Sequence, residues 1–204
     1  MPKTIMTCAI TGAIHTPTMS DALPINSEMI YEQSVAAAAA GAAVLHLHAR
    51  NPANGAPSID PAHFMEFLPR IKAETNAIVN ISTGGSLTST IEERMAPAVT
   101  ASPEMCSLNM GSLNFAMHPL ADRYSEYKYD WEEAYIRGSV GNIFRNTFAD
   151  IEAVSRTLGS DHGCKFEHEC YDVGHLHNLK FCMNQGLFKA PIFLQFVMGI
   201  LGGI

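Results

Sequence analysis

The sequence lacks the cysteine patterns that mark disulfide scaffolds and zinc knuckles. It has five cysteines, an odd number, and no two of them stand at C-x-x-C spacing. Such a set is typical of reduced thiols, so a cytoplasmic protein is expected. The cysteines therefore argue against a small secreted domain and against a metal site built from thiolates.

Basic charge and long apolar segments are also scarce. The 13 Lys and Arg residues are outnumbered by 20 Asp and Glu residues, and the net charge of −7 argues against a nucleic-acid-binding surface. The first residues do not join a basic region to a long apolar stretch, so no signal peptide is expected. The apolar segment 191–204 is about half the length needed to cross a bilayer. We therefore expect neither nucleic acid nor membrane as a partner.

Apolar residues are abundant, and they alternate between strand-like and helix-like patterns. The chain has 204 residues, 47% of them hydrophobic, which is enough for one sizeable core. We expect strands at 5–13, 43–49, 77–82, 105–110, 165–172 and 191–198, and helices at about 27–40, 60–71, 90–101 and 175–185. The segment 132–158 is expected to form one or two helices, with Gly138 and Gly141 as breaks. This alternation predicts an α/β protein with a parallel sheet and helices outside it.

The number of strands bears on the kind of α/β fold. A TIM (β/α)8-barrel has eight βα units and usually about 250 residues. The chain stops directly after its sixth strand in a glycine-rich segment, so we expect one barrel domain, residues 1–204, with about six βα units present and strands seven and eight missing. A complete doubly wound sheet is the alternative, but no G-x-G-x-x-G follows the first strand.

Local signals support several of the helices. Ser27 is a plausible N-cap before Glu28, and Asp60-Pro61 places proline at a first helical position. Thr90 and Glu93 have the spacing of a capping box. One helical stripe of apolar side chains predicts a face packed on the sheet, and it comprises Phe64, Phe67, Leu68 and Ile71.

Two histidines one residue apart, His46 and His48, are the most informative feature of the chain. They lie in Ala-Val-Leu-His-Leu-His-Ala-Arg, residues 43–50. Side chains alternate along a strand, so both imidazoles face one side while Leu45 and Leu47 face the other. A polar face inside a buried strand needs a partner, and two neutral imidazoles are half of a metal site. We favour metal binding over the alternative, a buried strand with two satisfied histidines.

Polar side chains also recur on one face of each later strand. The pairs are Asn80 and Ser82, Ser107 and Asn109, and Glu167 and Glu169, with Gln195 on the sixth strand. Chemistry in a parallel barrel collects at the C-terminal strand ends, so these groups are candidates for a site. The alternative for Asn80 and Gln195 is simple filling of the barrel interior.

The segment after Ser82 reads Thr83-Gly84-Gly85-Ser86, and a glycine-rich turn of this kind can hold an anion with its backbone N–H groups. A plain turn is the alternative. Glu169, near a strand end, could be a ligand, a base or an orienting group. His15 is expected to be a loop residue, and His175 and His177 are expected to be structural or surface groups because i and i+2 diverge on a helix.

Several strand-end segments together resemble one known family. They are Thr-Cys-Ala-Ile-Thr-Gly-Ala (7–13), Ala-Ala-Val-Leu-His-Leu-His-Ala-Arg (42–50), Ile-Ser-Thr-Gly-Gly-Ser (81–86), Pro-Glu-Met-Cys-Ser-Leu-Asn-Met-Gly-Ser (103–112) and Gln-Phe-Val-Met-Gly-Ile-Leu-Gly-Gly (195–203). In this order they resemble the β-keto acid cleavage enzymes, of which the 3-keto-5-aminohexanoate cleavage enzyme is the best-known type.

The resemblance implies a (β/α)8-barrel with a divalent metal, usually zinc. It implies an acyltransferase that converts a β-keto acid and acetyl-CoA into acetoacetate and a new acyl-CoA. His46 and His48 match the metal ligands, and Ser82, with the adjacent turn residues Thr83, Gly84 and Gly85, matches the part that binds the keto acid. Asn109 and Glu169 match polar pocket positions and are our candidates for catalytic roles. The resemblance also implies a homo-oligomer, often a tetramer.

The chain departs from the family in length. The family's third metal ligand, a glutamate on the last strand, and an assisting arginine have no counterpart before Ile204. An inactive truncated fragment is therefore one alternative. A different metal-dependent barrel, a hydrolase of the amidohydrolase type, is another, although that type places its H-x-H pair on the first strand.

Overall fold

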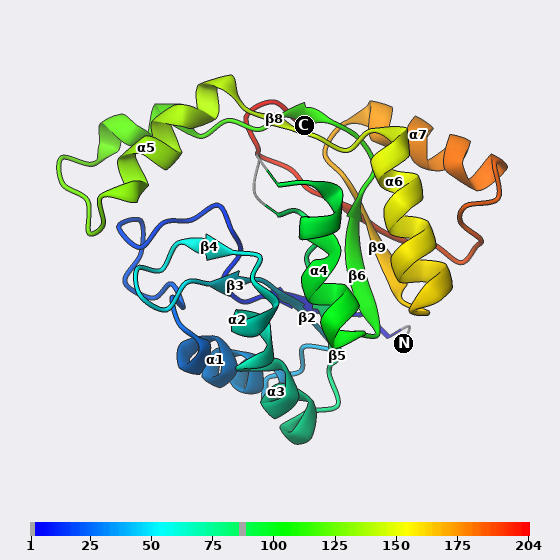
Figure 1. Ribbon diagram of the computed structural model, residues 1–204, viewed down its shortest axis with the longest axis horizontal. Helices are drawn as coiled ribbons and strands as arrows, with labels where there is room; N and C mark the ends of the chain where they lie inside the picture. Colours follow the sequence, from blue (N-terminus) through cyan, green and yellow to red (C-terminus); the bar gives the residue numbers. More distant parts are fainter. Residues whose placement is uncertain (1–2, 86–88) are drawn as a thin grey trace.

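The fold is built on a single curled parallel sheet. The computed structural model describes residues 3–85 and 89–204. Six parallel strands follow one another in chain order, and the sheet curls into a half-barrel (Figure 1). They are β1 (Thr7–Ala9), β2 (Val44–Leu47), β5 (Ile78–Ile81), β6 (Met105–Asn109), β9 (Lys165–Cys170) and β10 (Phe193–Phe196). The α/β barrel fold with about six βα units is thereby confirmed, although most strands are shorter than expected.

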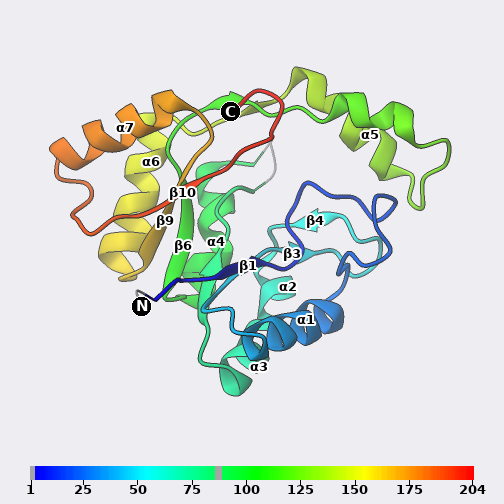
Figure 2. The same cartoon turned by 180° about the vertical axis from the view of Figure 1, so that it is seen from behind.

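Helices cover the outer face of this sheet, as Figures 1 and 2 show from opposite sides. They are α1 (Ser27–Ala39), α2 (Pro61–Met65), α3 (Leu68–Glu74), α4 (Ile91–Ala101), α6 (Phe148–Val154) with the π-helical η3 (Ser155–Asp161), and α7 (Val173–Asn184). None of the helices in the described part of the chain has the length and apolar character to cross a membrane.

A second group of short elements lies above the sheet, at the ends of the strands. Two antiparallel pairs belong to it: β3 (Ala49–Arg50) with β4 (Pro57–Ser58), and β7 (Leu113–Asn114) with β8 (Ile143–Phe144). The 3-10 helices η1 (His118–Arg123) and η2 (Ser139–Gly141) flank α5 (Trp131–Gly138). The segment 132–158 thus forms separate helices, with α5 ending at Gly138 and η2 at Gly141, the two expected breaks, and β8 pairs with β7 before α6 begins.

The helix starts show which local signals were correct. Asp60 caps α2 through Ala62 N, and Thr90 and Glu93 form the expected capping box. The expected N-cap Ser27 is wrong: Asn26 caps α1 by accepting a bond from Met29 N. The reason is tertiary, because the Ser27 hydroxyl donates to Glu66 on the neighbouring α2–α3 segment.

The two faces of the sheet differ in chemistry. The outer face is apolar and forms the main core with the helices, including the whole predicted stripe from Phe64 to Ile71. The inner face is polar yet buried, and its side chains are His46, Asn80, Ser107, Asn109, Glu167 and Glu169. The period-2 alternation of the strands is confirmed, and it places the chemically reactive residues on the concave side.

Candidate metal centre

His46 and His48 meet at the C-terminal end of β2. Their Nε2 atoms are 3.2 Å apart, and their ring centroids are 5.1 Å apart. Two nitrogens that bind one zinc ion at about 2.0–2.1 Å in tetrahedral geometry are about 3.3–3.4 Å apart. The separation therefore fits two ligands of one metal ion. It also fits a hydrogen bond in which the two rings share one proton.

The other nitrogen of His46 is held by Glu167 on β9. His46 Nδ1 lies 3.1 Å from Glu167 Oε2, which also accepts a bond of 2.7 Å from Asn80 Nδ2. Gln195, with its amide nitrogen turned to the carboxylate, donates to both Glu167 oxygens at 2.7 and 3.2 Å. Because the ionised Glu167 carboxylate can only accept hydrogen bonds, His46 Nδ1 carries a proton. The free lone pair of His46 is therefore on Nε2.

The two histidines differ in how readily they take up a proton. Burial alone lowers the pKa of His46, but the hydrogen bond to Glu167 and the charges of Glu169 and Glu167 leave that pKa raised. Burial, together with the neighbouring His46 and Arg50, lowers the pKa of His48 well below its usual value. His48 is thus a neutral imidazole at neutral pH, the form that binds metals. The residues fit a divalent metal ion.

A second grouping of possible ligand atoms involves the same histidine. One atom each from His46, Glu167 and Glu169 lies within 4.8 Å of the other two. In this set His46 would bind through Nδ1, which is 3.9 Å from Glu169 Oε1. Glu167 is already surrounded by side-chain donors, so we consider the Nε2 pair the better ligand set and Glu167 an orienting carboxylate.

Glu169 and Asn109, the two candidates for catalytic roles, lie side by side on the inner face. They are register partners on β9 and β6, and both line one cavity. Burial chiefly raises the pKa of Glu169, although nearby His46 and the bond donated by Tyr171, 3.0 Å long, oppose this. The Asn109 side chain is 1% exposed, and its Oδ1 has no hydrogen-bond partner among the described residues. A buried acceptor without a partner is costly, which is consistent with a donor on a ligand.

The predicted substrate turn after β5 has a mixed outcome. Ser82, Gly84 and Gly85 line the cavity. Ser82 Oγ accepts a bond from Gly84 N, 3.2 Å long, so its own hydroxyl proton stays available to a ligand. The Thr83 side chain is directed elsewhere, because its hydroxyl donates to Ser107 O at 2.7 Å. Ser86, the last residue of the predicted turn, lies outside the described residues.

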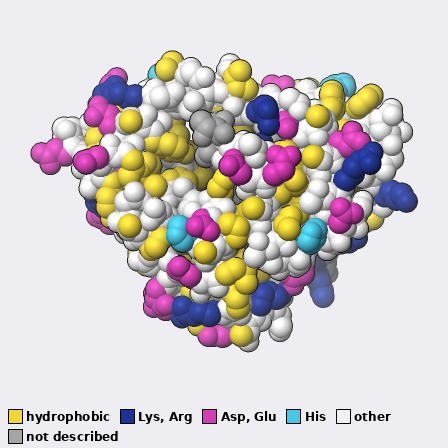
Figure 3. Space-filling view, in the orientation of Figure 1, with side chains coloured by type: hydrophobic (Ala, Val, Ile, Leu, Met, Phe, Trp, Pro, Cys, Tyr) yellow, Lys and Arg dark blue, Asp and Glu magenta, His cyan; other side chains and the backbone are white. Residues whose placement is uncertain are grey.

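The cavity above these groups has a volume of about 420 Å³ and walls that are mostly apolar. Figure 3 shows a hollow lined with hydrophobic side chains between α5 and the β3–β4 hairpin. Its apolar walls come from the loop after β1 and from the elements above the sheet, and they include Ile14, Phe115, Met117, Trp131, Tyr135, Phe144 and Tyr171. A more open cavity of about 520 Å³ adjoins it at His48 and Ser82.

The remaining histidines lie outside the centre. His15 is exposed, and its backbone carbonyl accepts a bond from Arg50. His175 is buried, but its Nδ1 accepts the Tyr171 backbone N–H at 3.1 Å, which is the expected structural role. Glu167 was among the polar residues expected on one strand face, but its role as the partner of His46 was not predicted.

Comparison with known sequences places this site in a family. The family model described as "beta-keto acid cleavage enzyme" matches residues 3–204. A 3,5-dioxohexanoate:acetyl-CoA acetone transferase from Paraburkholderia graminis is 52% identical over 202 residues, 99% of this chain and 65% of that protein. A 3-keto-5-aminohexanoate cleavage enzyme from Acetoanaerobium sticklandii is 33% identical over 205 residues, 100% of this chain and 66% of that protein.

Comparison with solved structures supports the fold. The apo structure of ObcA matches with a TM-score of 0.66 and 22% sequence identity, over 89% of this chain and 37% of that chain. The chain therefore spans slightly less than two thirds of the length of the curated relatives and a smaller share of the solved structure.

Proposed function

Because the chain belongs to the beta-keto acid cleavage enzyme family, we propose that it takes part in a zinc-dependent exchange between a β-keto acid and acetyl-CoA. The acyl group R–CO leaves the methylene carbon of R–CO–CH2–COO⁻ and joins the sulfur of coenzyme A. The acetyl group takes its place on that carbon, so the products are acetoacetate and R–CO–CoA. The observation that carries the proposal is the pair of Nε2 atoms of His46 and His48, 3.2 Å apart beside the cavity.

Each polar group of the site has a proposed task. A bound metal ion would supply a Lewis acid for the keto oxygen of the substrate. Glu167 keeps the proton of His46 on Nδ1, and Ser82 with the Gly84-Gly85 turn binds the substrate carboxylate. Glu169, whose pKa is raised mainly by burial, can hold or release a proton close to the reacting carbons. Asn109 Oδ1 accepts a bond from the ligand.

The cavity favours a β-keto acid whose R group carries no charge. Among the described residues that line it, Glu169 is the only carboxylate, and neither lysine nor arginine lines it. Aromatic and aliphatic walls stabilise an uncharged R group, but they offer no partner to a cationic or anionic one. The name of the transferase from Paraburkholderia graminis indicates a β-keto acid whose R group is uncharged, 3,5-dioxohexanoate.

Some features stay predictions. Two histidines are fewer protein ligands than catalytic zinc usually has, so a third ligand, from the protein or from water, is needed to complete the shell. A cytoplasmic location, a single domain over 1–204 and a homo-oligomer, a tetramer by resemblance, also remain to be tested.

The test is product analysis with the zinc-loaded chain. We would incubate it with acetyl-CoA and 3-oxohexanoate (neutral R), 3-oxoadipate (anionic R) or 3-keto-5-aminohexanoate (cationic R), and detect acetoacetate and R–CO–CoA by mass spectrometry. We expect products from the neutral acid, and none from the variant His46→Ala/His48→Ala. Cleavage that proceeds without acetyl-CoA would support the hydrolase alternative. Zinc binding without any product would support the inactive-fragment alternative.

A further inference from the structure

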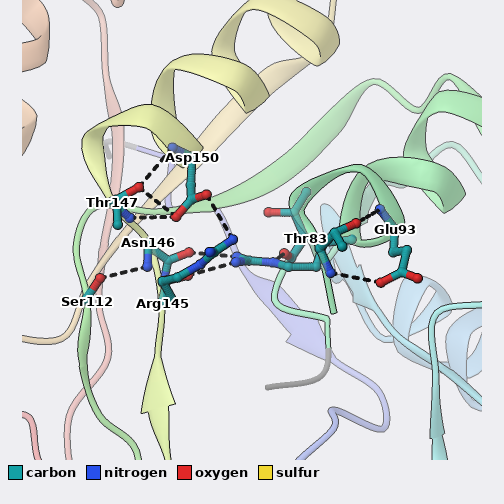
Figure 4. Close-up of polar contacts among 9 residues, drawn as sticks. Thr83, Glu93, Ser112, Arg145, Asn146, Thr147 and Asp150 are labelled. Carbon is teal, nitrogen blue, oxygen red and sulfur yellow. Dashed lines mark hydrogen bonds and ion pairs between the residues drawn. The ribbon is translucent and has the colours of Figure 1, made fainter. Parts of the chain in front are cut away.

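Arg94, on the first turns of α4, is a buried cation that joins three segments near the cavity. Its side chain is 4% exposed. Nε donates to Thr83 O at 2.8 Å, Nη1 to Arg145 O at 2.7 Å, and Nη2 to Asn146 Oδ1 at 2.6 Å. Figure 4 shows Thr83 on one side of this junction, with Arg145 and Asn146 on the other. Arg94 therefore ties the turn after β5 to the segment between β8 and α6.

On the β5 side, Arg94 determines the course of the proposed carboxylate turn. Gly85 has φ +63°, and a Cβ atom added there would lie 2.3 Å from Arg94 Cγ. Glycine is thus needed both for its backbone conformation and for the close approach of the arginine. The Thr83 carbonyl, which Arg94 holds, lies between Ser82 and Gly84, and both of these line the cavity.

On the other side, Asn146 extends the junction to the end of β6. Its backbone N–H donates to Ser112 Oγ at 2.8 Å, and its Nδ2 donates to Gly111 O at 3.3 Å. Phe144, two residues earlier, lines the cavity, and the Arg94 guanidinium lies 5.7 Å from the centre of its ring. The turn and one apolar wall of the cavity are therefore fixed relative to each other through a single side chain.

The charge of Arg94 is not neutralised by direct contact. All three acceptors are neutral oxygens, and no carboxylate in residues 3–85 and 89–204 forms an ion pair with it. Burial chiefly lowers the pKa of Arg94 to about 10, with Asp150 opposing this, so the guanidinium stays protonated at neutral pH. Burying an unpaired cation costs free energy, and a bound anion nearby would offset that cost.

We propose that Arg94 is a positioning residue for the carboxylate subsite at Ser82, Gly84 and Gly85, where it both fixes the turn and supplies positive potential for the substrate carboxylate. This inference rests on the proposed function, because it requires a keto acid to bind at this turn. Arg94, which lies outside the cavity, thus favours an anionic head group on the ligand, whereas the apolar walls favour an uncharged R group.

The experiment measures acetoacetate binding to the zinc-loaded 204-residue chain by titration calorimetry. Arg94→Met removes both the three bonds and the charge. Asn146→Asp keeps an acceptor for Arg94 but places a carboxylate against it, so the positive potential is neutralised. The new ion pair with Arg94 offsets the loss of the long bond to Gly111 O. Arg156→Met is the control, because it also removes one positive charge, but from a side chain that is 72% exposed and pairs with Glu152. Zinc affinity and thermal unfolding are measured for every variant.

We expect Arg94→Met to bind acetoacetate at least about tenfold more weakly, since small displacements of a positioning group have effects of this size or larger. We expect Asn146→Asp to bind it severalfold more weakly without loss of thermal stability, a combination that a purely structural role does not produce. Zinc affinity in both variants, and acetoacetate affinity in the control, should stay within about twofold of the unmodified chain.

Two results would overturn the inference about Arg94 alone: unchanged acetoacetate affinity in a folded Arg94→Met variant, or unchanged affinity in Asn146→Asp. If Arg94→Met does not fold, Asn146→Asp decides the question. If the unmodified chain binds zinc but not acetoacetate, the proposed function is wrong at the substrate, and the inference fails with it.

Discussion

Replacement of Glu167 by glutamine tests the assignment of the metal ligands most directly. The Glu167 carboxylate accepts from His46 Nδ1 at 3.1 Å, from Asn80 Nδ2 at 2.7 Å and from Gln195 at 2.7 and 3.2 Å. An amide of the same shape has one oxygen, so its NH2 group faces a donor unless Gln195 turns as well. A neutral amide oxygen also accepts more weakly than a carboxylate, so the tautomer and orientation of the His46 ring are held less firmly.

The expected magnitude follows from this indirect role. Loss of a partner that orients a ligand typically weakens metal binding by about 10–100-fold, which corresponds to about 1.4–2.7 kcal/mol. The assay is zinc competition against a chromophoric chelator at constant pH. Glu152→Gln is the matched control, because it removes the same charge from an exposed position on α6 where Glu152 pairs with Arg156.

The same assay distinguishes the two possible ligand sets. If the two Nε2 atoms bind the metal, His48→Ala should weaken zinc binding more than Glu167→Gln does, because it removes a ligand. If His46 Nδ1, Glu167 and Glu169 bind it instead, His48→Ala should have little effect and Glu167→Gln should abolish tight binding. Zinc affinity in Glu167→Gln equal to that of the unmodified chain would refute both arguments.

Three further predictions concern pH, the turn and the core. The proton competes with the metal for His46, whose pKa is raised, so zinc affinity should be full above that pKa and fall as pH decreases through it. Zinc titrations between about pH 5 and 8 would show this, and an affinity that does not change with pH would contradict it. Gly85→Ala should lower the free energy of unfolding by about 1–3 kcal/mol in urea melts, since its φ is +63° and the new Cβ would meet Arg94. Phe67→Ala, at a fully buried position beneath the sheet, should cost about 3–5 kcal/mol in the same melts, and a loss below about 1 kcal/mol would show that the core closes over the gap.

Much of the fold could be predicted because its signals are local. The alternation in β2 correctly placed Leu45 and Leu47 in the core and His46 on the opposite face. The capping box of Thr90 and Glu93 also formed as the spacing predicted. The error at the start of α1 arose because the competing partner of Ser27, Glu66, lies 39 residues away, between α2 and α3, and reaches Ser27 only in the folded protein.

For the candidate site, spacing along one strand brings the histidine pair together, but it does not show which carboxylate contacts that pair. His46 and His48 are two residues apart, so strand geometry alone brings them to one face. Glu167 lies 121 residues from His46, and their contact depends on how β2, β5, β6 and β9 align with one another. Arg94 was not singled out at all, because a lone arginine in an amphipathic helix gives no sign of which carbonyls surround it.

The six strands of the main sheet, most of the helices that cover it, and the histidine pair at the end of β2 could all be predicted from the sequence. These features depend on residues two to four positions apart, so they need no contact between distant segments. The short pairs β3–β4 and β7–β8, the contact of Glu167 with His46 and the hold of Arg94 on the turn beyond Ser82 depend on the tertiary structure. Strand register and helix packing bring those groups together, and both are set by the burial of the whole apolar face rather than by any short segment.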